Sequence, residues 1–313
     1  MKAVVIDRFG GPEVLEFDDV DVPEPLTGQV RIRVQAAAVN PVDLATRAGR
    51  LAEHGLMRAT GRIGIGWDLA GFVDATGPGV ERWQPGDPVI AMRDLLSAPI
   101  GAQAEYVVLD GEAVAGAPAS VSPAEAATVP LNGLTAWQAL DLLGLQAGQS
   151  LLVTGAAGAL GGFAVQLAAL RGLRVLAVAS PQDEPLVYEL GADEFVPRTD
   201  DLGAAVRRRA PGGVDAALDA GIAGISALEA VRDGGAFVAV SAGAAPVPLR
   251  GTRVHNVWIR TDAAQLAELS ALVDRGCLST RVAAVQPLET VAAAHRRLAT
   301  GGLRGRLVLE PSR

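Results

Sequence analysis

The sequence predicts an α/β fold with a doubly wound parallel sheet, joined to a β-rich domain that both ends of the chain build. Three observations indicate this fold. Apolar strand-like runs alternate with Ala-rich helical stretches from Ser150 onward, as in βαβ units. Before residue 120, charged and apolar residues alternate instead, which is typical of half-buried strands. Finally, residues 305–309 form a last short apolar run that could pair with the N-terminal region.

The first part of the chain contains short apolar or alternating runs bounded by Gly and Pro turns. The strands predicted from them span residues 4–6, 30–34, 71–75, 88–91 and 104–109. Ser122-Pro-Ala-Glu125 then predicts a helix start. Ser is a favoured N-cap, Pro suits the first helical position and Glu completes a capping box.

The middle and the end of the chain supply the remaining elements. Further strands are predicted at 151–153, 174–179, 216–219 and 236–240, with a helix at 163–170 and another between the last two strands. Helices at 262–275 and 288–298 precede the final strand. We therefore divide the chain into a β-rich domain (1–118), a parallel-sheet domain (119–258) and a return segment that completes the first domain (259–313).

Charge and composition exclude several classes of function. The net charge is -8, so the chain lacks the basic surface that binding to nucleic acid requires. No apolar run reaches the roughly 20 residues needed to cross a bilayer, and no signal peptide is recognisable. Cys277 is the only cysteine, which prevents an internal disulfide and fits a reducing compartment. We expect a cytoplasmic protein with no membrane or nucleic-acid partner.

A Gly-rich turn after the strand at 151–153 predicts a dinucleotide site. The turn reads Thr154-Gly-Ala-Ala-Gly158-Ala-Leu-Gly161 and leads into a helix. Glycines allow the backbone to approach a pyrophosphate, and the helix N-terminus offers N–H groups. The alternatives are a turn that only packs the helix on the sheet, or a methyltransferase with the same turn. The expected cofactor contacts are Gly155, Ala156, Ala157, Gly158, Ala159, Leu160 and Gly161.

The second strand of this domain favours NADP(H) over NAD(H). It ends at Ser180, where an NAD site usually has an acid that binds the ribose. Arg198 could provide a cation for a 2′-phosphate, although it could also be an ordinary surface residue, and Asp183 and Glu184 argue against a phosphate. Further candidate cofactor contacts follow the next two strands, at Ala220 and Ser241.

With these motifs, the chain resembles the medium-chain dehydrogenase/reductase superfamily, and in particular its zinc-independent quinone oxidoreductase branch. The order and spacing of many short segments carry the resemblance: GGPEVL (10–15), VQAAAVNPVD (34–43), GWDLAG (66–71), WQPGD (83–87), GAQAEY (101–106), AATVP (126–130), LTAW (134–137), ELGAD (189–193) and GRLVL (305–309). The resemblance implies an irregular β-barrel-like (GroES-like) catalytic domain, a Rossmann domain, an active site between them, and oligomers, of which we expect a homodimer.

Zinc is not expected. Structural zinc usually needs four closely spaced thiolates and catalytic zinc needs three protein ligands. The chain has one cysteine, and its histidines, His54, His255 and His295, are widely separated. The resemblance places Asn40 where zinc-containing relatives have a Cys ligand, and Asp68 in the segment where they have Gly-His-Glu.

The resemblance also supplies the candidate catalytic residues. It places Asn40 near the nicotinamide, where the amide could donate to a carbonyl oxygen that gains negative charge. Alternatively, Asn40 bonds its own backbone after a strand. Asp43 would brace that loop or be purely structural, and Thr135 would lie near the nicotinamide or serve as a capping hydroxyl. No dedicated acid is apparent, so the second proton would come from water or a ribose hydroxyl.

The predicted function is NADPH-dependent, metal-free hydride transfer to quinones or α,β-unsaturated carbonyl compounds. An enoyl-thioester reductase or a zinc-free alcohol dehydrogenase on the same scaffold remains open. So does a non-catalytic NADPH-binding sensor or structural protein.

Overall fold

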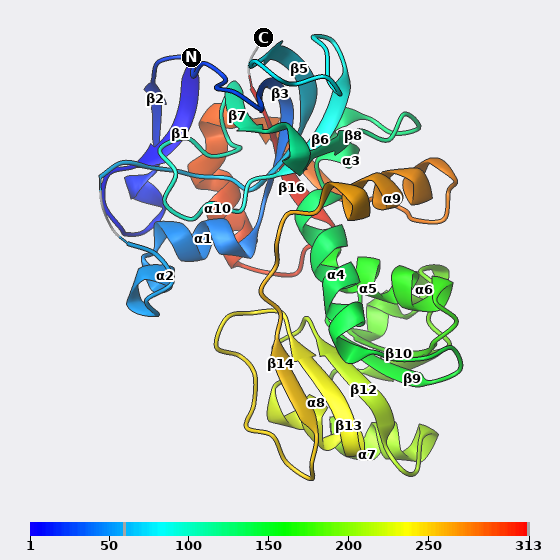
Figure 1. The fold of residues 1–313 in the computed structure, drawn as a ribbon. Coiled ribbons are helices and arrows are strands. Elements are labelled where there is room, and N and C mark those ends of the chain that lie inside the picture. The colour runs from blue at the N-terminus through cyan, green and yellow to red at the C-terminus, as the bar shows by residue number, and fades with distance from the viewer. Residues whose placement is uncertain (59–60, 312–313) are drawn as a thin grey trace. The chain divides into compact units, whose positions relative to one another are not determined.

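The structure, a computed structural model, describes residues 1–58 and 61–311 and divides into two compact units. The first contains residues 1–131, 260–275 and 280–313, and the second contains 132–259 and 276–279. Both ends of the chain thus belong to the same unit (Figure 1). The sequence placed the first boundary after residue 118, whereas residues 119–131 lie in the first unit. Helix α3 (Pro123–Ala126) explains this, because it packs on strands β3 (Gln29–Val39) and β5 (Asp68–Thr76).

The main sheet of the first unit is organised around the long strand β3. Its strand order is β15-β16-β3-β5-β6-β8, and β7 also pairs with β3. The bounds are β6 (Pro88–Met92), β7 (Tyr106–Asp110), β8 (Val114–Gly116), β15 (Val282–Pro287) and β16 (Arg306–Glu310). Strand β16 runs antiparallel to β3, with Val308 opposite Ala38. The predicted return of the last strand to the N-terminal domain is therefore confirmed.

A second, smaller sheet and several short helices complete the first unit. The sheet has the order β2-β1-β4, formed by β1 (Lys2–Ile6), β2 (Glu16–Asp19) and β4 (Ile63–Gly64). The helices are α1 (Pro41–Arg47), α2 (Arg50–Glu53), α9 (Ala263–Asp274) and α10 (Val291–Ala299). One apolar core joins the small sheet and helices α1, α2 and α10 to the main sheet and includes Val4, Leu44, Val291 and Leu307, whereas α9 contacts β8 and β6.

The second unit is a parallel sheet with helices, as predicted. The strand order is β11-β10-β9-β12-β13-β14, and every neighbouring pair is parallel. The strands are β9 (Ser150–Thr154), β10 (Arg174–Ala179), β11 (Glu194–Pro197), β12 (Val214–Asp219), β13 (Val231–Ala239) and β14 (Arg253–Asn256). The helices are α4 (Pro130–Leu143), whose first two residues belong to the first unit, α5 (Ala159–Leu170), α6 (Glu184–Glu189), α7 (Leu202–Arg209) and α8 (Ile225–Glu229). Strand β9 lies at the centre of the order and all its residues are buried.

Local sequence signals predicted the starts of some helices better than those of others. The capping box at Ser122 is present, since its backbone N–H donates to Glu125 (2.9 Å) and its Oγ accepts the Glu125 N–H (3.3 Å). The helix expected from residue 163 begins earlier, at Ala159, because Gly158 is its N-cap. The helix expected at 288–298 starts with a 3₁₀ turn (Leu288–Thr290) before α10. Within the described residues, no helix has the length and apolar character to span a membrane.

Candidate functional site

The Gly-rich turn has the backbone geometry of a tight strand-to-helix connection. Gly155 follows β9 with a φ of +62°, in the left-handed region that favours glycine. Gly158, whose N–H donates to the Gly155 carbonyl (2.9 Å), precedes α5 as its N-cap. A Cβ at Gly161 would lie 2.1 Å from the Gly155 carbonyl oxygen. The first turn of α5 therefore packs directly on the loop. The N-terminus of a helix in general favours an anion.

Asp219, at the end of β12, organises the loop beside that turn. Its buried carboxylate accepts hydrogen bonds from Thr154 Oγ1 (2.5 Å), Ala223 N (2.9 Å) and Gly224 N (2.8 Å). Thr154 Oγ1 in turn accepts the N–H of Gly221 (2.9 Å). These bonds bring the predicted contact Ala220 next to Gly155, since a Cβ at Gly155 would lie 3.1 Å from the Ala220 carbonyl carbon.

Ser180 and Arg198, the residues predicted to select the cofactor, lie side by side. Strands β10 and β11 end together, with Ala179 opposite Pro197, and the Arg198 N–H donates to the Ala179 carbonyl (2.9 Å). The Arg198 side chain is exposed and makes no ion pair with any described residue. Asp183 is buried one turn after Ser180. Ser241 follows β13, and its carbonyl accepts the Asn256 side-chain amide (2.9 Å).

Thr135 lies inside α4 rather than at a helix end. The helix begins at Pro130, so the alternative role of a capping hydroxyl does not apply. Thr135 is buried and belongs to the second unit. Its expected place near the nicotinamide stays a prediction.

Asn40 and Asp43 belong to a buried polar cluster in the first unit. Asn40 is the N-cap of α1, and its backbone N–H donates to Asp43 Oδ2 (2.7 Å). Asp43 thus braces Asn40 through the backbone, in a helix start rather than the loop that the sequence suggested. The Asn40 side-chain Nδ2 donates to Asp68 Oδ2 (2.9 Å). The other oxygen of Asp68 accepts the Leu131 N–H (2.7 Å).

The two carboxyl groups of this cluster are perturbed by their surroundings. Burial raises the pKa of Asp43 to about 8, against the hydrogen bond from the Asn40 backbone and the charge of Arg306. Burial likewise raises the pKa of Asp68 to about 7, against the hydrogen bond from the Asn40 side chain. Arg306, on β16, is buried too, and burial lowers its pKa to about 10. A carboxyl proton is therefore retained in this cluster near neutral pH.

Sequence reasoning missed the structural importance of Asp68, Arg306 and Asp219, and of Gln103, which donates to Asp43 (3.4 Å). Asp68 was noted only as a replacement in a zinc segment. For Asp68, Arg306 and Asp219, the available signal was a charged residue at the end of, or within, an apolar strand-like run. Such residues are seldom buried unless they are paired.

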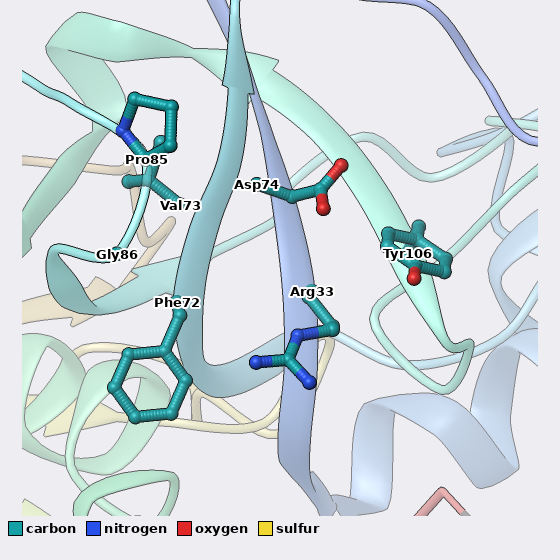
Figure 2. A pocket seen from close by; sticks show the side chains of 7 residues that line it. All are labelled: Arg33, Phe72, Val73, Asp74, Pro85, Gly86 and Tyr106. Carbon is teal, nitrogen blue, oxygen red and sulfur yellow. The ribbon is translucent and has the colours of Figure 1, made fainter. Parts of the chain in front are cut away.

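Two other polar sites lie in the first unit. Figure 2 shows a hollow on the sheet where Arg33 lies between Phe72 and Tyr106, with the Arg33 guanidinium 5.9 Å from the centre of the Phe72 ring. None of the sequence-predicted site residues lines it. His295 is buried in α10, with Nδ1 3.2 Å from Arg47 Nη1, and burial lowers its pKa to about 3. The described residues include no group of three or more His, Cys, Asp or Glu placed to hold a metal ion.

Comparisons with known proteins agree with this architecture. Residues 27–119 match the family model for an alcohol dehydrogenase GroES-like domain, and residues 190–309 match that for a zinc-binding dehydrogenase. A quinone oxidoreductase of Lama guanicoe is 30% identical over 328 residues, covering 99% of this chain and 97% of that protein. Two solved structures match this chain over 99% of its length and over 99% of their own length. They are a quinone oxidoreductase from Coxiella burnetii (TM-score 0.90, 30% identity) and an NAD-dependent alcohol dehydrogenase (TM-score 0.87, 34% identity).

Proposed function

The chain belongs to the medium-chain dehydrogenase/reductase superfamily, in its quinone oxidoreductase-like branch, and from that premise we propose that it reduces quinones or α,β-unsaturated carbonyl compounds with NADPH and without a metal. As a member of this family, it is an NAD(P)H-dependent oxidoreductase. The observation that carries the finer proposal is the turn from Gly155 to Gly161, joined by the Asp219 hydrogen bonds to the neighbouring loop. This arrangement is suited to a dinucleotide pyrophosphate.

The preference for NADPH rests on the ends of β10 and β11. Ser180 offers a hydroxyl where an acid would repel a 2′-phosphate, and the neighbouring Arg198 offers an exposed cation. Arg matches the geometry of phosphate well. Titration of the protein with NADPH and NADH side by side tests this preference, and tighter binding of NADH would contradict it.

The proposed chemistry needs binding and orientation more than acid–base groups. NADPH, when bound, supplies the hydride. The first turn of α5 would bind the pyrophosphate, while Asn40 and Thr135 would hold the nicotinamide and the acceptor in aligned contact, a source of much of the rate. The proposal that the reaction needs no metal ion is supported by the single cysteine and by Asn40, whose amide Nδ2 donates to Asp68. A neutral amide engaged as a donor is a poor substitute for a thiolate ligand.

The activity is tested by loss of NADPH absorbance with a panel of quinones, enones and aldehydes. We expect turnover with at least one quinone or enone, and unchanged turnover after treatment with a zinc chelator. Tight NADPH binding without turnover of any compound would instead favour the non-catalytic sensor.

A second candidate, a zinc-free alcohol dehydrogenase, is favoured by the similarity to an NAD-dependent alcohol dehydrogenase at 34% identity. The same assay run in reverse separates the two. Reduction of NAD⁺ or NADP⁺ by simple alcohols, with no quinone or enone activity, would select the alcohol dehydrogenase.

We also propose a homodimer in the cytoplasm. Strand β14 lies at the end of the strand order in the second unit, so one of its edges has no neighbour among the described strands. Val247 precedes β14 in the chain and Trp258 follows it, and the two residues are 76% and 62% exposed. An open edge flanked by apolar side chains is suited to pairing with a second copy. Light scattering after size exclusion measures the mass, and a monomer at micromolar concentration would exclude the dimer.

A further inference from the structure

The side chain of Asn40 is held in one orientation. Its Nδ2 donates to Asp68 Oδ2 at 2.9 Å, which assigns the two ends of the amide. Its Oδ1 is buried and has no hydrogen-bond partner among the described residues. Asn40 and Asp43 have the arrangement of a capping box, but the N–H of Asp43 donates to the Asn40 backbone oxygen (3.0 Å) and the Asn40 side chain makes no capping hydrogen bond. A buried oxygen without a partner is uncommon and points to a ligand that completes it.

Asp68, the partner of Asn40, is itself firmly fixed. Its backbone lies in β5, paired with Ala38 on one side and Met92 on the other. Its second oxygen accepts the N–H of Leu131 at 2.7 Å, and the positive charge of Arg306 also favours its ionised form. Asp68 is completely buried, so solvent does not compete for these bonds. Its carboxylate therefore offers one oxygen to Asn40 in a constant position.

We propose that Asp68 is a positioning residue for the hydride-transfer reaction. By accepting an N–H from Asn40, it turns the amide so that Oδ1 faces away and accepts an N–H or O–H of the bound ligand. This inference rests on the proposed function, because it assumes that Asn40 lies at the reaction site. It also revises the role expected from the sequence. Asn40 acts as an acceptor that orients the ligand rather than as the donor to the carbonyl oxygen.

Two ligand groups have the required chemistry. The carboxamide of the nicotinamide carries N–H donors, and a hydroquinone or alcohol carries an O–H donor. An NADPH analogue with an acetyl group in place of the carboxamide distinguishes them, because it lacks the N–H. If wild-type protein discriminates against the analogue in kcat/KM and Asn40→Ala does not, the donor is the cofactor. Equal discrimination by both proteins assigns the donor to the substrate.

The positioning role is tested by a double-mutant cycle on Asp68 and Asn40. Asp68→Asn can present an N–H to Asn40 Oδ1 and so occupy the acceptor. We expect it to lower kcat/KM tenfold or more, and the NADPH affinity should fall with it only if the ligand donor is the carboxamide of the cofactor. In the Asn40→Ala background the same substitution should have no further effect. An equal loss in both backgrounds would show a merely structural role and overturn the proposal.

A spectroscopic measurement on the whole protein keeps this test independent of activity. The sequence contains three asparagines, Asn40, Asn132 and Asn256, so ¹⁵N-Asn labelling gives few side-chain signals. The pair of side-chain N–H signals that disappears in Asn40→Ala belongs to Asn40. Asp68→Asn should shift the Asn40 signals strongly. The control, Asp74→Asn, lies in the same strand but removes only an ion pair with Arg31, and should leave the signal unchanged. If the Asn40 signals do not shift in Asp68→Asn, the positioning role is refuted. If the wild-type protein shows no turnover, only the proposed function is refuted.

Discussion

Gly161→Ala tests whether the Gly-rich turn binds the cofactor. The added Cβ would lie 2.1 Å from the Gly155 carbonyl oxygen and 2.8 Å from the Ala156 Cα. Non-bonded carbon contacts are favourable only at about 3.5–4.0 Å, so the loop and the first turn of α5 must separate by about 1 Å. Both contacts are backbone atoms, so a side-chain rotation cannot relieve them.

The size of the effect follows from that displacement. A shift of about 1 Å removes at least one N–H from hydrogen-bonding distance to the pyrophosphate. Hydrogen bonds to charged groups contribute about 1.5–3 kcal/mol, which corresponds to a rise of about 10- to 150-fold in the Kd for NADPH. The crowding also costs about 1–3 kcal/mol of folding stability.

Fluorescence titration of NADPH measures the affinity, and thermal unfolding confirms that the variant is folded. Gly212→Ala is the matched control, since its Cβ would meet no atom within 4 Å in the same unit. A folded Gly161→Ala protein that binds NADPH within about twofold of wild type would refute the assignment of the turn.

Other predictions concern residues of both units. Asp219→Ala removes one hydrogen bond from Thr154 and two from the loop containing Ala220, and should lower the unfolding free energy by about 2–4 kcal/mol, with weaker NADPH binding by titration. Arg198→Ala should raise the Kd for NADPH about tenfold and leave that for NADH unchanged, if it binds the 2′-phosphate. Burial lowers the pKa of His295 from 6.5 to about 3, so only the unfolded state gains its proton as the pH falls below 6.5. The contribution of His295 to stability should therefore decrease by about 1.4 kcal/mol per pH unit in that range, while the raised pKa values of Asp43 and Asp68 act in the opposite direction in wild type and variant alike. Urea unfolding at pH 7 and pH 5 should show the His295 contribution as the difference between wild type and His295→Gln. Trp258→Glu should increase the monomer fraction in light scattering, and an unchanged dimer would place the interface elsewhere.

The second unit was more predictable from sequence than the first. The run from β9 through Gly155 to α5 joins an apolar strand, turn glycines and a helix, and each signal is local. The strand ends at Ser180 and Ala220 were found for the same reason. Strands β2, β4, β8 and β15 of the first unit were missed because they are short or alternate weakly, and pairing with other segments stabilises them. The second unit also contains two short strands that were not predicted, β11 and β14.

The cluster around Asn40 shows what local reasoning omits. Asn40, Pro41 and Asp43 together form a helix-start signal that, applied here, would have predicted α1. The bond from Asn40 to Asp68 spans 28 residues, and Arg306 lies hundreds of residues further along the chain. No periodicity relates such positions. Only the pairing of β3 with β5 and β16 brings them together.

The pairing of β3 with β16 also affects how the protein is synthesised. Strand β3 ends at Val39, but its partner begins at Arg306. At 5–20 residues per second, the ribosome needs about 13–50 s to make the intervening segment. The parallel sheet, complete at Asn256, emerges in full during that interval, while an edge of Ala37 to Val39 stays uncovered. We expect this apolar edge to remain open to chaperones during translation, and the second unit to reach its native state first.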